Sequence, residues 1–391
     1  MDETPGTATP RNPQRRSFLA GCLHCALFCT VSQVLPFWPL ASNSTAQEIK
    51  KGLPGLKLSP YFTPLGDKRV RCDLCPRQCE TSSGERGYCR VRENRDGQYY
   101  SLVYGNPCAV HVDPIEKKPF FHVLPASSSF SIATAGCNFN CKFCQNWEIS
   151  QASPDDTMNY ELSPERVVQT AARYQCSSIA STYVEPTIFI EYMIGIGKLT
   201  KGSKILNVMH SNGYINKKPL DDLCDCLDAA CIDLKGFTEA YYHEITEGTL
   251  EPVLATLRQL KSRGIHTEIV NLIVPGKNDD IGRIRAMCRW IKNELGPDVP
   301  THFTRFYPLY KLKSIEPTPI TTLETAWKAA TEEGLHFAYI GNVPGHPAEN
   351  TLCPNCRFPV IKRFGNNVTS VSLKYGKCSE CGRAIPGIWS V

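Results

Sequence analysis

Short apolar runs alternate with amphipathic stretches along the chain beyond residue 120. The apolar runs have the length of single strands and span residues 129–135, 178–183, 204–210, 229–234, 266–273, 301–307 and 336–341. The stretches between them have helical spacing of apolar residues and span 163–174, 187–200, 218–227, 252–262, 280–294 and 321–333. Regular alternation of strand and helix predicts βα units and a parallel sheet.

One of these stretches also carries a helix start signal. In SPERVVQTAARY, Ser163 is in the N-cap position and Pro164 is the first helical residue. Six or seven such βα units predict an α/β fold with a full or partial (β/α) barrel. In that architecture functional residues collect where the strands end.

The composition narrows the functional classes. With 391 residues, the chain is long enough for one large domain with smaller attachments. Its 43 Lys and Arg nearly balance its 38 Asp and Glu. This balance gives no strong field for nucleic acid or an anionic membrane, so partners have to be argued from sites, and nucleic acid is not expected.

Cysteine is abundant and clustered. Many of the 20 cysteines fall at 72–89, 137–144 and 353–381, in pairs separated by two or three residues. Such close pairs are more typical of metal ligands than of disulfides. The remaining cysteines, which include Cys176, Cys224, Cys226, Cys231 and Cys288, lack metal spacing as a group and are interpreted as core or incidental residues.

The stretch SIATAGCNFNCKFCQNWEIS follows the first strand of the predicted barrel. Its three cysteines, Cys137, Cys141 and Cys144, have C-x3-C-x2-C spacing. A closed zinc site takes four ligands, and no further cysteine or histidine follows nearby. Three thiolates on a cubic iron–sulfur cluster would instead leave one iron open to chelate a small molecule. The alternative is a loop of buried free cysteines or a partial zinc knuckle.

The spacing C-x3-C-x-aromatic-C, with Phe143 as the aromatic residue, resembles the signature of radical S-adenosylmethionine (SAM) enzymes. The resemblance implies a [4Fe-4S] cluster whose open iron binds the amino and carboxylate groups of SAM, with Phe143 against adenine. It also implies reductive cleavage of SAM to a 5′-deoxyadenosyl radical, which abstracts hydrogen from a substrate that the motifs do not identify.

Residues at later strand ends extend the resemblance. Glu185 in STYVEPTIF corresponds to an acidic residue that binds the SAM amino group. Ser211 and Asn212 in HSNGY match positions near the SAM polar groups in pyruvate formate-lyase activating enzymes. Taken alone, a residue such as Glu185 is more often an exposed strand-end carboxylate.

The fourth and fifth strands add further candidates. Asp233 and Lys235 in CIDLKGF alternate onto one face and resemble the Asp-x-Lys pair that holds the methionyl end of SAM. Alone, such a pair is more often a surface ion pair. Asn271, in NLIVPGKND, is the candidate polar contact near adenine.

The sixth strand departs from the activating enzymes, which have a histidine near its end. In HFTRFYP, Tyr307 occupies that place, while His302 and Arg305 lie upstream. The sequence leaves open which of the three faces the site.

Across residues 70–391 the chain resembles the radical SAM member of the AmmeMemoRadiSam system, on segments such as VRCDLCPRQCETSSGERGYCRVREN and YGNPCAVHVDPIEKKPFFHVLP. This resemblance implies a low-potential electron donor and the companion proteins of that system as partners. A glycyl-radical enzyme activase is the alternative activity.

Two further cysteine groups predict metal sites outside the barrel. Cys72, Cys75, Cys79 and Cys89 satisfy either a second iron–sulfur cluster or a structural zinc, with free thiols as the alternative. Cys353, Cys356, Cys378 and Cys381 enclose a strand-like stretch and are similar to a zinc ribbon, with a rubredoxin-type iron site as the alternative.

A non-catalytic electron-transfer or nucleic-acid-binding protein is the hypothesis from another class. The ribbon segment RFPVIKRFGNNV is only mildly basic and has no aromatic-basic run, which argues against nucleic acid. A simple electron carrier would not need a barrel with Glu185, Asp233 and Lys235 at its strand ends.

The N-terminal segment suggests a targeting signal. Arg15 and Arg16 precede a moderately apolar stretch, which resembles a twin-arginine export signal with a cleavage site at residues 44–46. Its polar residues and prolines make it a poor membrane span. The resemblance to a twin-arginine signal predicts export to the periplasm. A cytoplasmic location is the alternative, because SAM and low-potential electron donors are supplied in the cytoplasm.

The predicted organisation has four parts. They are a leader at 1–46, a cysteine-rich segment at 47–125, a radical SAM barrel at 126–345 and a zinc-ribbon-like module at 346–391.

Overall fold

A computed structural model describes residues 49–391. The predicted leader at residues 1–46 lies outside the described residues. Within the described part of the chain, no helix combines the length and the apolar character needed to cross a membrane.

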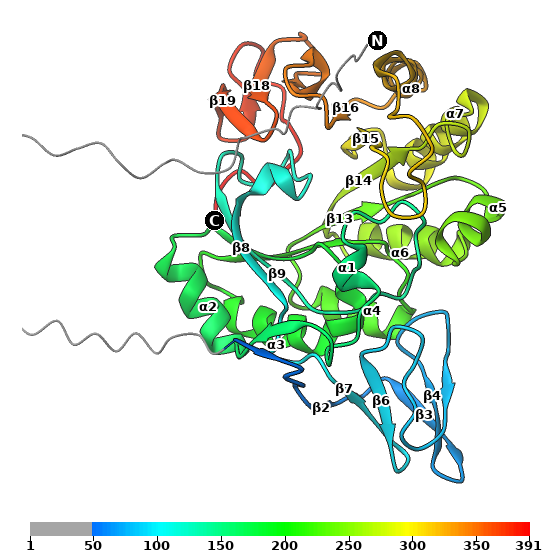
Figure 1. Ribbon diagram of the computed structural model, residues 1–391. Helices are drawn as coiled ribbons and strands as arrows, with labels where there is room; N and C mark the ends of the chain where they lie inside the picture. The colour runs from blue at the N-terminus through cyan, green and yellow to red at the C-terminus, as the bar shows by residue number, and fades with distance from the viewer. Residues whose placement is uncertain (1–48) are drawn as a thin grey trace, which may run out of the picture. The chain divides into compact units, whose positions relative to one another are not determined.

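An eight-stranded sheet lies at the centre, with strand order β16-β15-β14-β13-β12-β11-β9-β8 (Figure 1). Its strands span Ala109–Pro114 (β8), Ser128–Ala133 (β9), Ser178–Ser181 (β11), Leu206–Ser211 (β12), Ala229–Asp233 (β13), His266–Ile273 (β14), Thr301–Arg305 (β15) and Ala338–Gly341 (β16). Neighbours from β9 to β16 are parallel, and β8 pairs with β9 antiparallel. Because β16 and β8 are the two edges, the predicted barrel is confirmed in its partial, open form.

The helices connect successive parallel strands. The longer ones span Pro164–Arg173 (α2), Ile190–Thr200 (α3), Lys217–Cys224 (α4), Glu251–Ser262 (α6), Ile281–Trp290 (α7) and Ile320–Glu332 (α8). Shorter turns span Trp147–Ser150 (α1), Glu239–Tyr241 (α5), Ile115–Lys117 (η1), Pro186–Phe189 (η2), Tyr242–Thr246 (η3), Ile291–Leu295 (η4) and Pro347–Glu349 (η5). Ser163 caps α2 as predicted, since its side chain accepts a hydrogen bond from the Arg166 backbone N–H at 3.4 Å.

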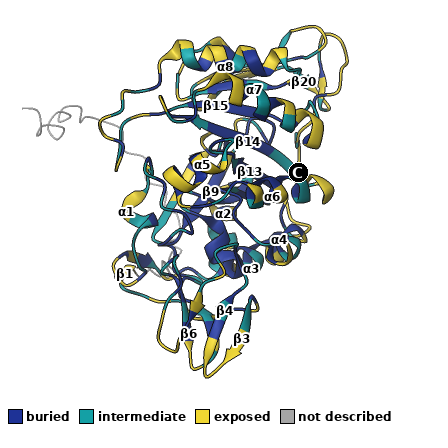
Figure 2. Ribbon diagram, turned by 90° about the vertical axis from the view of Figure 1, so that its right-hand side faces the viewer, coloured by how far each residue is buried: buried dark blue, intermediate teal, exposed yellow. Residues whose placement is uncertain are grey.

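The parallel strands are covered on both faces. Every residue of β11 is buried, as are the first four of β13, which explains why small or apolar residues and no charged ones occupy these positions. Figure 2 shows β13 and β14 mostly buried, while α7 and α8 turn an exposed face to solvent.

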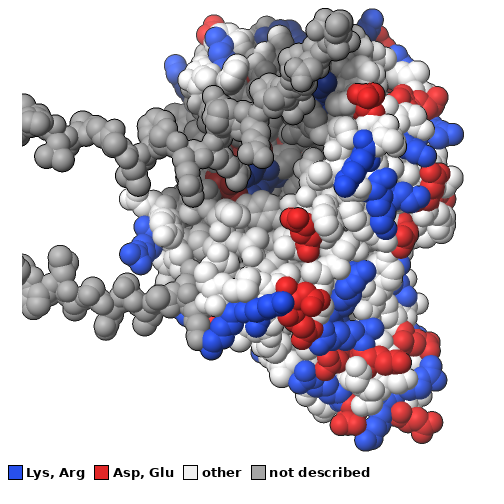
Figure 3. Space-filling model, in the orientation of Figure 1, with Lys and Arg blue, Asp and Glu red and all other residues white. Residues whose placement is uncertain are grey.

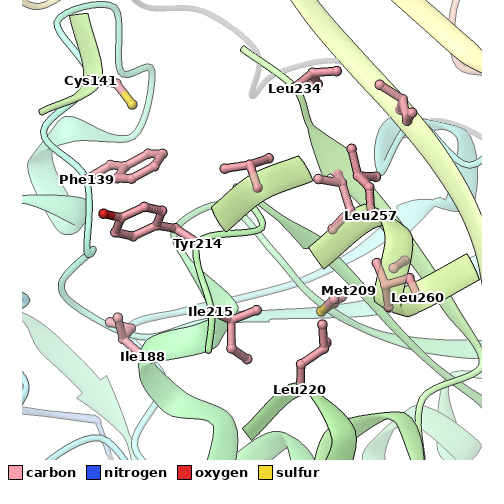
Figure 4. Close-up of a cluster of buried hydrophobic side chains, with 14 of the residues drawn as sticks. Phe139, Cys141, Ile188, Met209, Tyr214, Ile215, Leu220, Leu234, Leu257 and Leu260 are labelled. Atoms are coloured by element: carbon pink, nitrogen blue, oxygen red, sulfur yellow. The ribbon is translucent and has the colours of Figure 1, made fainter. Parts of the chain in front are cut away.

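The core between sheet and helices is aliphatic. Figure 4 shows Met209 of β12 near Leu220 of α4 and near Leu257 and Leu260 of α6, all of them buried. Burying one such side chain contributes about 1.5–3 kcal/mol to folding. This layer holds the strands in register and so fixes where their carboxyl ends lie.

The cysteine-rich N-terminal segment consists of small antiparallel sheets. One comprises Lys57–Leu58 (β2), Gln98–Ser101 (β7) and Arg92–Arg95 (β6), and another Phe62–Gly66 (β3), Arg69–Cys72 (β4) and Glu80–Thr81 (β5). In addition, Ile49–Lys51 (β1) pairs with Met158–Tyr160 (β10). The predicted boundary at residue 125 falls between β8 and β9, which pair with each other, so β8 belongs to the central sheet and not to the N-terminal segment.

The C-terminal segment adds its own small sheet, at the other end of the view from β3, β4 and β6 (Figure 1). It comprises Thr351–Leu352 (β17), Pro359–Phe364 (β18) and Asn367–Val371 (β19), followed by the pair Leu373–Lys374 (β20) and Lys377–Cys378 (β21). Its buried residues, among them Cys353 and Val360, pack with Phe121 and Tyr339 of the barrel region.

Candidate active site at the carboxyl ends of the strands

A cavity of about 620 Å³ opens at the carboxyl edge of the sheet. Its walls include nine residues that the sequence predicted for this site: Cys137, Cys141, Phe143, Cys144, Glu185, Ser211, Asn212, Asp233 and Lys235. They come from the last residues of β12 and β13 and from the loops after β9, β11, β12 and β13. Parallel strands end at the same edge, which explains why residues so far apart in sequence meet here.

The cysteine loop leaves β9 through Gly136, whose φ of +89° lies in the left-handed region. The Phe139 backbone N–H donates to the Cys137 Sγ at 3.4 Å, and the Cys144 N–H donates to the Cys141 carbonyl at 3.1 Å. Figure 4 shows the Phe139 ring beside that of Tyr214, with centroids 4.8 Å apart. The loop is therefore ordered by its own backbone and by packing against the end of β12.

Burial raises the pKa of the Cys141 thiol to about 12, although the nearby Lys235 ammonium opposes the rise. The pKa of Cys137 is raised as well, by burial first and then by Glu185. A metal bound here has to displace these protons, since thiolates are the ligand form.

Glu185 is almost fully buried, with 1% of its surface exposed. One carboxylate oxygen accepts from the Ser211 hydroxyl at 2.7 Å and the Thr187 N–H at 2.9 Å. The other accepts from the Asn212 N–H at 2.7 Å. Burial raises the pKa of Glu185, while these donors oppose the rise. Glu185 is thus a buried carboxyl group that three hydrogen bonds fix at the cavity wall, and not an exposed strand-end residue.

Asp233 and Lys235 form an ion pair of 2.7 Å at the cavity wall. The other Asp233 oxygen is 2.8 Å from the His210 Nε2. Burial alone would raise the pKa of Asp233, but the Lys235 charge and the His210 ring hold it below its usual range. The Lys235 Nζ lies 5.4 Å from the centroid of the Phe143 ring, so a charged pair and an aromatic face meet in one wall.

Asn271 is the exception among the predicted site residues. It lies on β14 between Val270 and Leu272, which line the cavity, and it donates to the Leu234 carbonyl at 2.7 Å. Asn271 instead lines a separate small pocket with Met287 of α7. The geometry therefore does not support its predicted contact with adenine, because alternate residues of a strand point to opposite faces.

On the sixth strand, β15, the structure resolves the choice that the sequence left open. His302 and Thr304 line the cavity, and the His302 Nε2 lies 2.8 Å from the buried Glu268 carboxylate. Arg305 donates instead to the Thr318 carbonyl, and Tyr307 is 43% exposed.

Sequence reasoning missed two walls of the cavity. Lys117 and Phe121 contribute from the connection between β8 and β9, and Glu349 and Asn366 from the C-terminal segment. His210 was missed too, although it directly precedes Ser211 in the HSNGY stretch. No local pattern marks the two walls, because only the fold brings these segments against the open side of the barrel.

The donor set suits the predicted cluster and its ligand. The cavity brings three thiols from one loop together with the Glu185 and Asp233 carboxylates and the Lys235 ammonium. Its volume lies in the range of pockets that enclose small-molecule ligands.

The four C-terminal cysteines form a second candidate site. Their sulfur atoms lie within 4.8 Å of one another, with 3.5 Å between Cys353 and Cys381 and 3.7 Å between Cys356 and Cys378. Thiolates around one tetrahedral zinc, each with a Zn–S bond near 2.3 Å, lie about 3.8 Å apart. The group therefore fits a single tetrahedral metal ion.

Comparison with known proteins agrees with this arrangement. The family model described as "Radical SAM superfamily" matches residues 131–291. The chain is 45% identical over 327 residues to "Uncharacterized protein MJ0808" of Methanocaldococcus jannaschii, which covers 83% of this chain and 97% of that protein. It is 26% identical to "Putative glycyl-radical enzyme activating enzyme MJ1632" of the same organism, over 47% of this chain and 69% of that protein.

Among solved structures, the chain is similar to a domain of pyruvate-formate lyase-activating enzyme from Bacteroides vulgatus. The TM-score is 0.37 at 17% identity, covering 42% of this chain and 98% of that one. A radical SAM methyltransferase from Sphaerobacter thermophilus gives a TM-score of 0.44 at 13% identity, covering 55% of this chain and 66% of that one.

Proposed function

The chain belongs to the radical SAM superfamily, and we propose that Cys137, Cys141 and Cys144 hold the [4Fe-4S] cluster with which it cleaves SAM. The observation that carries the proposal is the shared cavity, in which the three thiols face Glu185, Asp233 and Lys235. When bound, the cluster supplies one electron for cleavage of SAM to a 5′-deoxyadenosyl radical, which abstracts hydrogen from the substrate.

The chain's own residues bind and orient SAM. The Glu185 carboxylate, held by Ser211, Thr187 and Asn212, has one lone pair left on its second oxygen to accept from the SAM amino group. Lys235 offers an ammonium to the methionyl carboxylate, with Asp233 keeping that ammonium in place. Phe143 presents a ring to adenine. The cavity walls keep water and oxygen away from a reactive species.

The test is anaerobic reconstitution of the full chain, reduction with dithionite and measurement of 5′-deoxyadenosine formed from SAM. Wild-type protein should form 5′-deoxyadenosine, and Cys141→Ala should form none. Wild-type protein that carries iron but yields no 5′-deoxyadenosine would refute the proposed reaction. Full activity in Cys141→Ala would refute the ligand assignment.

Glycyl-radical enzyme activation is the second candidate, favoured by the 26% identity to a putative activating enzyme. In that case the substrate is a glycine on a partner protein. Incubation with a candidate glycyl-radical protein and SAM should then give a glycyl radical visible by electron paramagnetic resonance (EPR). A small-molecule substrate would give no such signal.

Three finer assignments complete the proposal. Zinc is the expected ion at the C-terminal cysteines, with iron as the alternative, and the companion proteins of the AmmeMemoRadiSam system are expected partners. The residue 1–46 leader would direct twin-arginine export to the periplasm. Arg15→Lys with Arg16→Lys should then retain the protein in the cytoplasm, and wild-type protein found there with its leader intact would exclude export.

A further inference from the structure

The four N-terminal cysteines gather at one end of the β3–β4–β5 sheet. Cys72 ends β4, and its backbone N–H donates to the Cys79 carbonyl at 2.8 Å, which closes the loop between them. Cys75 lies within this loop, and Cys89 comes just before β6. Cys72, Cys75 and Cys89 are buried, whereas Cys79 is partly exposed. Segments 17 residues apart in the sequence thus bring their thiols to one buried place.

A buried hydroxyl beside these thiols lacks a partner. Tyr99 of β7 is fully buried, and its hydroxyl makes no hydrogen bond to any described residue. At Gly87, an added Cβ would lie 2.7 Å from this hydroxyl and 3.6 Å from the Cys79 Sγ, so the hydroxyl and the thiol border the same small space. An unpaired buried hydroxyl is costly, which indicates a bound group that accepts its hydrogen bond.

The sulfur spacing distinguishes this group from the C-terminal one. Among residues 49–391, only the C-terminal cysteines bring their ligand atoms within 4.8 Å of one another. Within the same residues, neither the N-terminal four nor the three cysteines of the SAM site form such a group. The N-terminal cysteines therefore lack the compact single-ion arrangement that the C-terminal four have.

The two cysteine loops are in direct contact. A Cβ on Gly136 would collide with the Cys89 carbonyl oxygen, and Gly136 directly precedes Cys137. Arg77, between Cys75 and Cys79, donates from its Nε to the Asn138 carbonyl. A surface hollow of about 330 Å³ is lined by Cys79 together with Arg77 and Tyr88. The N-terminal cysteines thus lie between solvent and the SAM site.

We propose that Cys72, Cys75, Cys79 and Cys89 bind a second iron–sulfur cluster, which takes one electron from an external low-potential donor and passes it to the cluster of Cys137, Cys141 and Cys144. Each transfer moves one electron and makes or breaks no bond. Only the identity of the acceptor rests on the proposed function, because the second site is defined by its own residues.

The decisive variant removes the SAM-site ligands and leaves the N-terminal group intact. After anaerobic reconstitution with iron and sulfide, Cys137→Ala/Cys141→Ala/Cys144→Ala should keep about four irons per chain, the content of one cubic cluster. Dithionite should give this variant the EPR signal of a reduced cluster, and SAM should leave the signal unchanged. A variant that folds but holds no iron, or that holds a second zinc in its place, would overturn the proposal.

Two further substitutions, each made in the Cys137→Ala/Cys141→Ala/Cys144→Ala variant, identify the ligands. Cys79→Ala, at the least buried of the four, should abolish the remaining iron. Cys108→Ala, at a partly exposed cysteine outside the three groups, should keep it. Equal iron in both would show that the metal is bound elsewhere.

Tyr99→Phe tests the group without removing a ligand. The Tyr99→Phe variant should keep its full iron content. The reduction potential of its second cluster should be lower, because a hydrogen bond to cluster sulfur raises that potential and the variant lacks the donor. An unchanged potential would exclude the hydroxyl as a donor to the cluster.

The relay is tested by EPR of the fully reduced wild-type protein. Two adjacent paramagnetic clusters should broaden each other's signals, so that the wild-type spectrum differs from the sum of the single-cluster variants. A simple sum would refute the relay. If the second cluster is present but wild-type protein cleaves no SAM, the proposed function fails and the second site stands.

Discussion

Glu185 carries the clearest prediction at the scale of single residues. Its carboxylate is the shared acceptor of Ser211, Asn212 and Thr187, and it faces the cavity. Glu185→Ala should raise the SAM dissociation constant about tenfold or more, since a hydrogen bond to a charged group is worth about 1.5–3 kcal/mol. The cluster absorption spectrum should stay intact. The matched control is Glu148→Ala, an exposed carboxylate on α1, which should bind SAM normally. Loss of the cluster in Glu185→Ala would show that Glu185 is structural instead.

The Asp233–Lys235 pair makes a second residue-scale prediction. Asp233→Asn removes the counter-charge of a lysine side chain that is only 12% exposed, whereas His210→Gln removes a neighbour of Asp233 and leaves the pair intact. Asp233→Asn should therefore weaken SAM binding more than His210→Gln does. The expected difference in binding free energy is about 1–3 kcal/mol, and solvent screening limits it because Asp233 is itself partly exposed. Equilibrium binding measures both. The reverse order would mean that the His210 contact, not the ion pair, holds Lys235.

At the scale of elements, the turn from β9 into the cysteine loop depends on Gly136. Its φ is +89°, and the space for a Cβ is filled by the Cys89 carbonyl oxygen and by Val91 and Ile188. Gly136→Ala should lose cluster iron and destabilise the protein. Gly202→Ala is a matched control, because Gly202 also has a positive φ, of +77°, but has open space around it. The control should cost only about 1 kcal/mol in unfolding free energy, as measured by denaturant titration. Equal losses in the two variants would show that backbone strain alone matters.

At the scale of the whole molecule, the C-terminal segment is a wall of the cavity. Glu349 and Asn366 line it, and the same segment carries the four cysteines that are placed to bind one metal ion. Cys356→Ser with Cys381→Ser should lose about one metal ion per chain, since a single tetrahedral site is removed. SAM cleavage without substrate should persist, because the SAM-binding residues come from other loops. Elemental analysis and a 5′-deoxyadenosine assay check the two outcomes, and Cys226→Ser is the control. Retained metal would exclude these residues as ligands.

The distribution of surface charge agrees with the balanced composition. Figure 3 shows Lys and Arg interspersed with Asp and Glu on the face it presents, with neither sign forming a continuous patch around the N-terminal strands. Specific recognition at the cavity, not a general field, is then expected to select the substrate.

From residue 129 to residue 341, the sequence by itself determined the order of the parallel strands and the helices between them. Periodicity is local, so the strand and helix ranges were confirmed within a few residues, and the cysteine spacing marks a loop whose ligands are near neighbours. Glu185, Asp233 and Lys235 could be predicted because the residues around them resemble the radical SAM pattern, and they meet because parallel strands bring their carboxyl ends to one edge.

Only the tertiary structure decided which side chains face the cavity. Asn271 points away from it although it adjoins the strand end, and on β15 His302 and Thr304 face it in place of Tyr307, because strand twist and register set the direction of each side chain. The contributions of Lys117, Phe121, Glu349 and Asn366, like the contact between Cys89 and Gly136, join segments far apart in sequence. No local pattern records such contacts, because they arise only when the whole sheet is assembled and its open edge is covered.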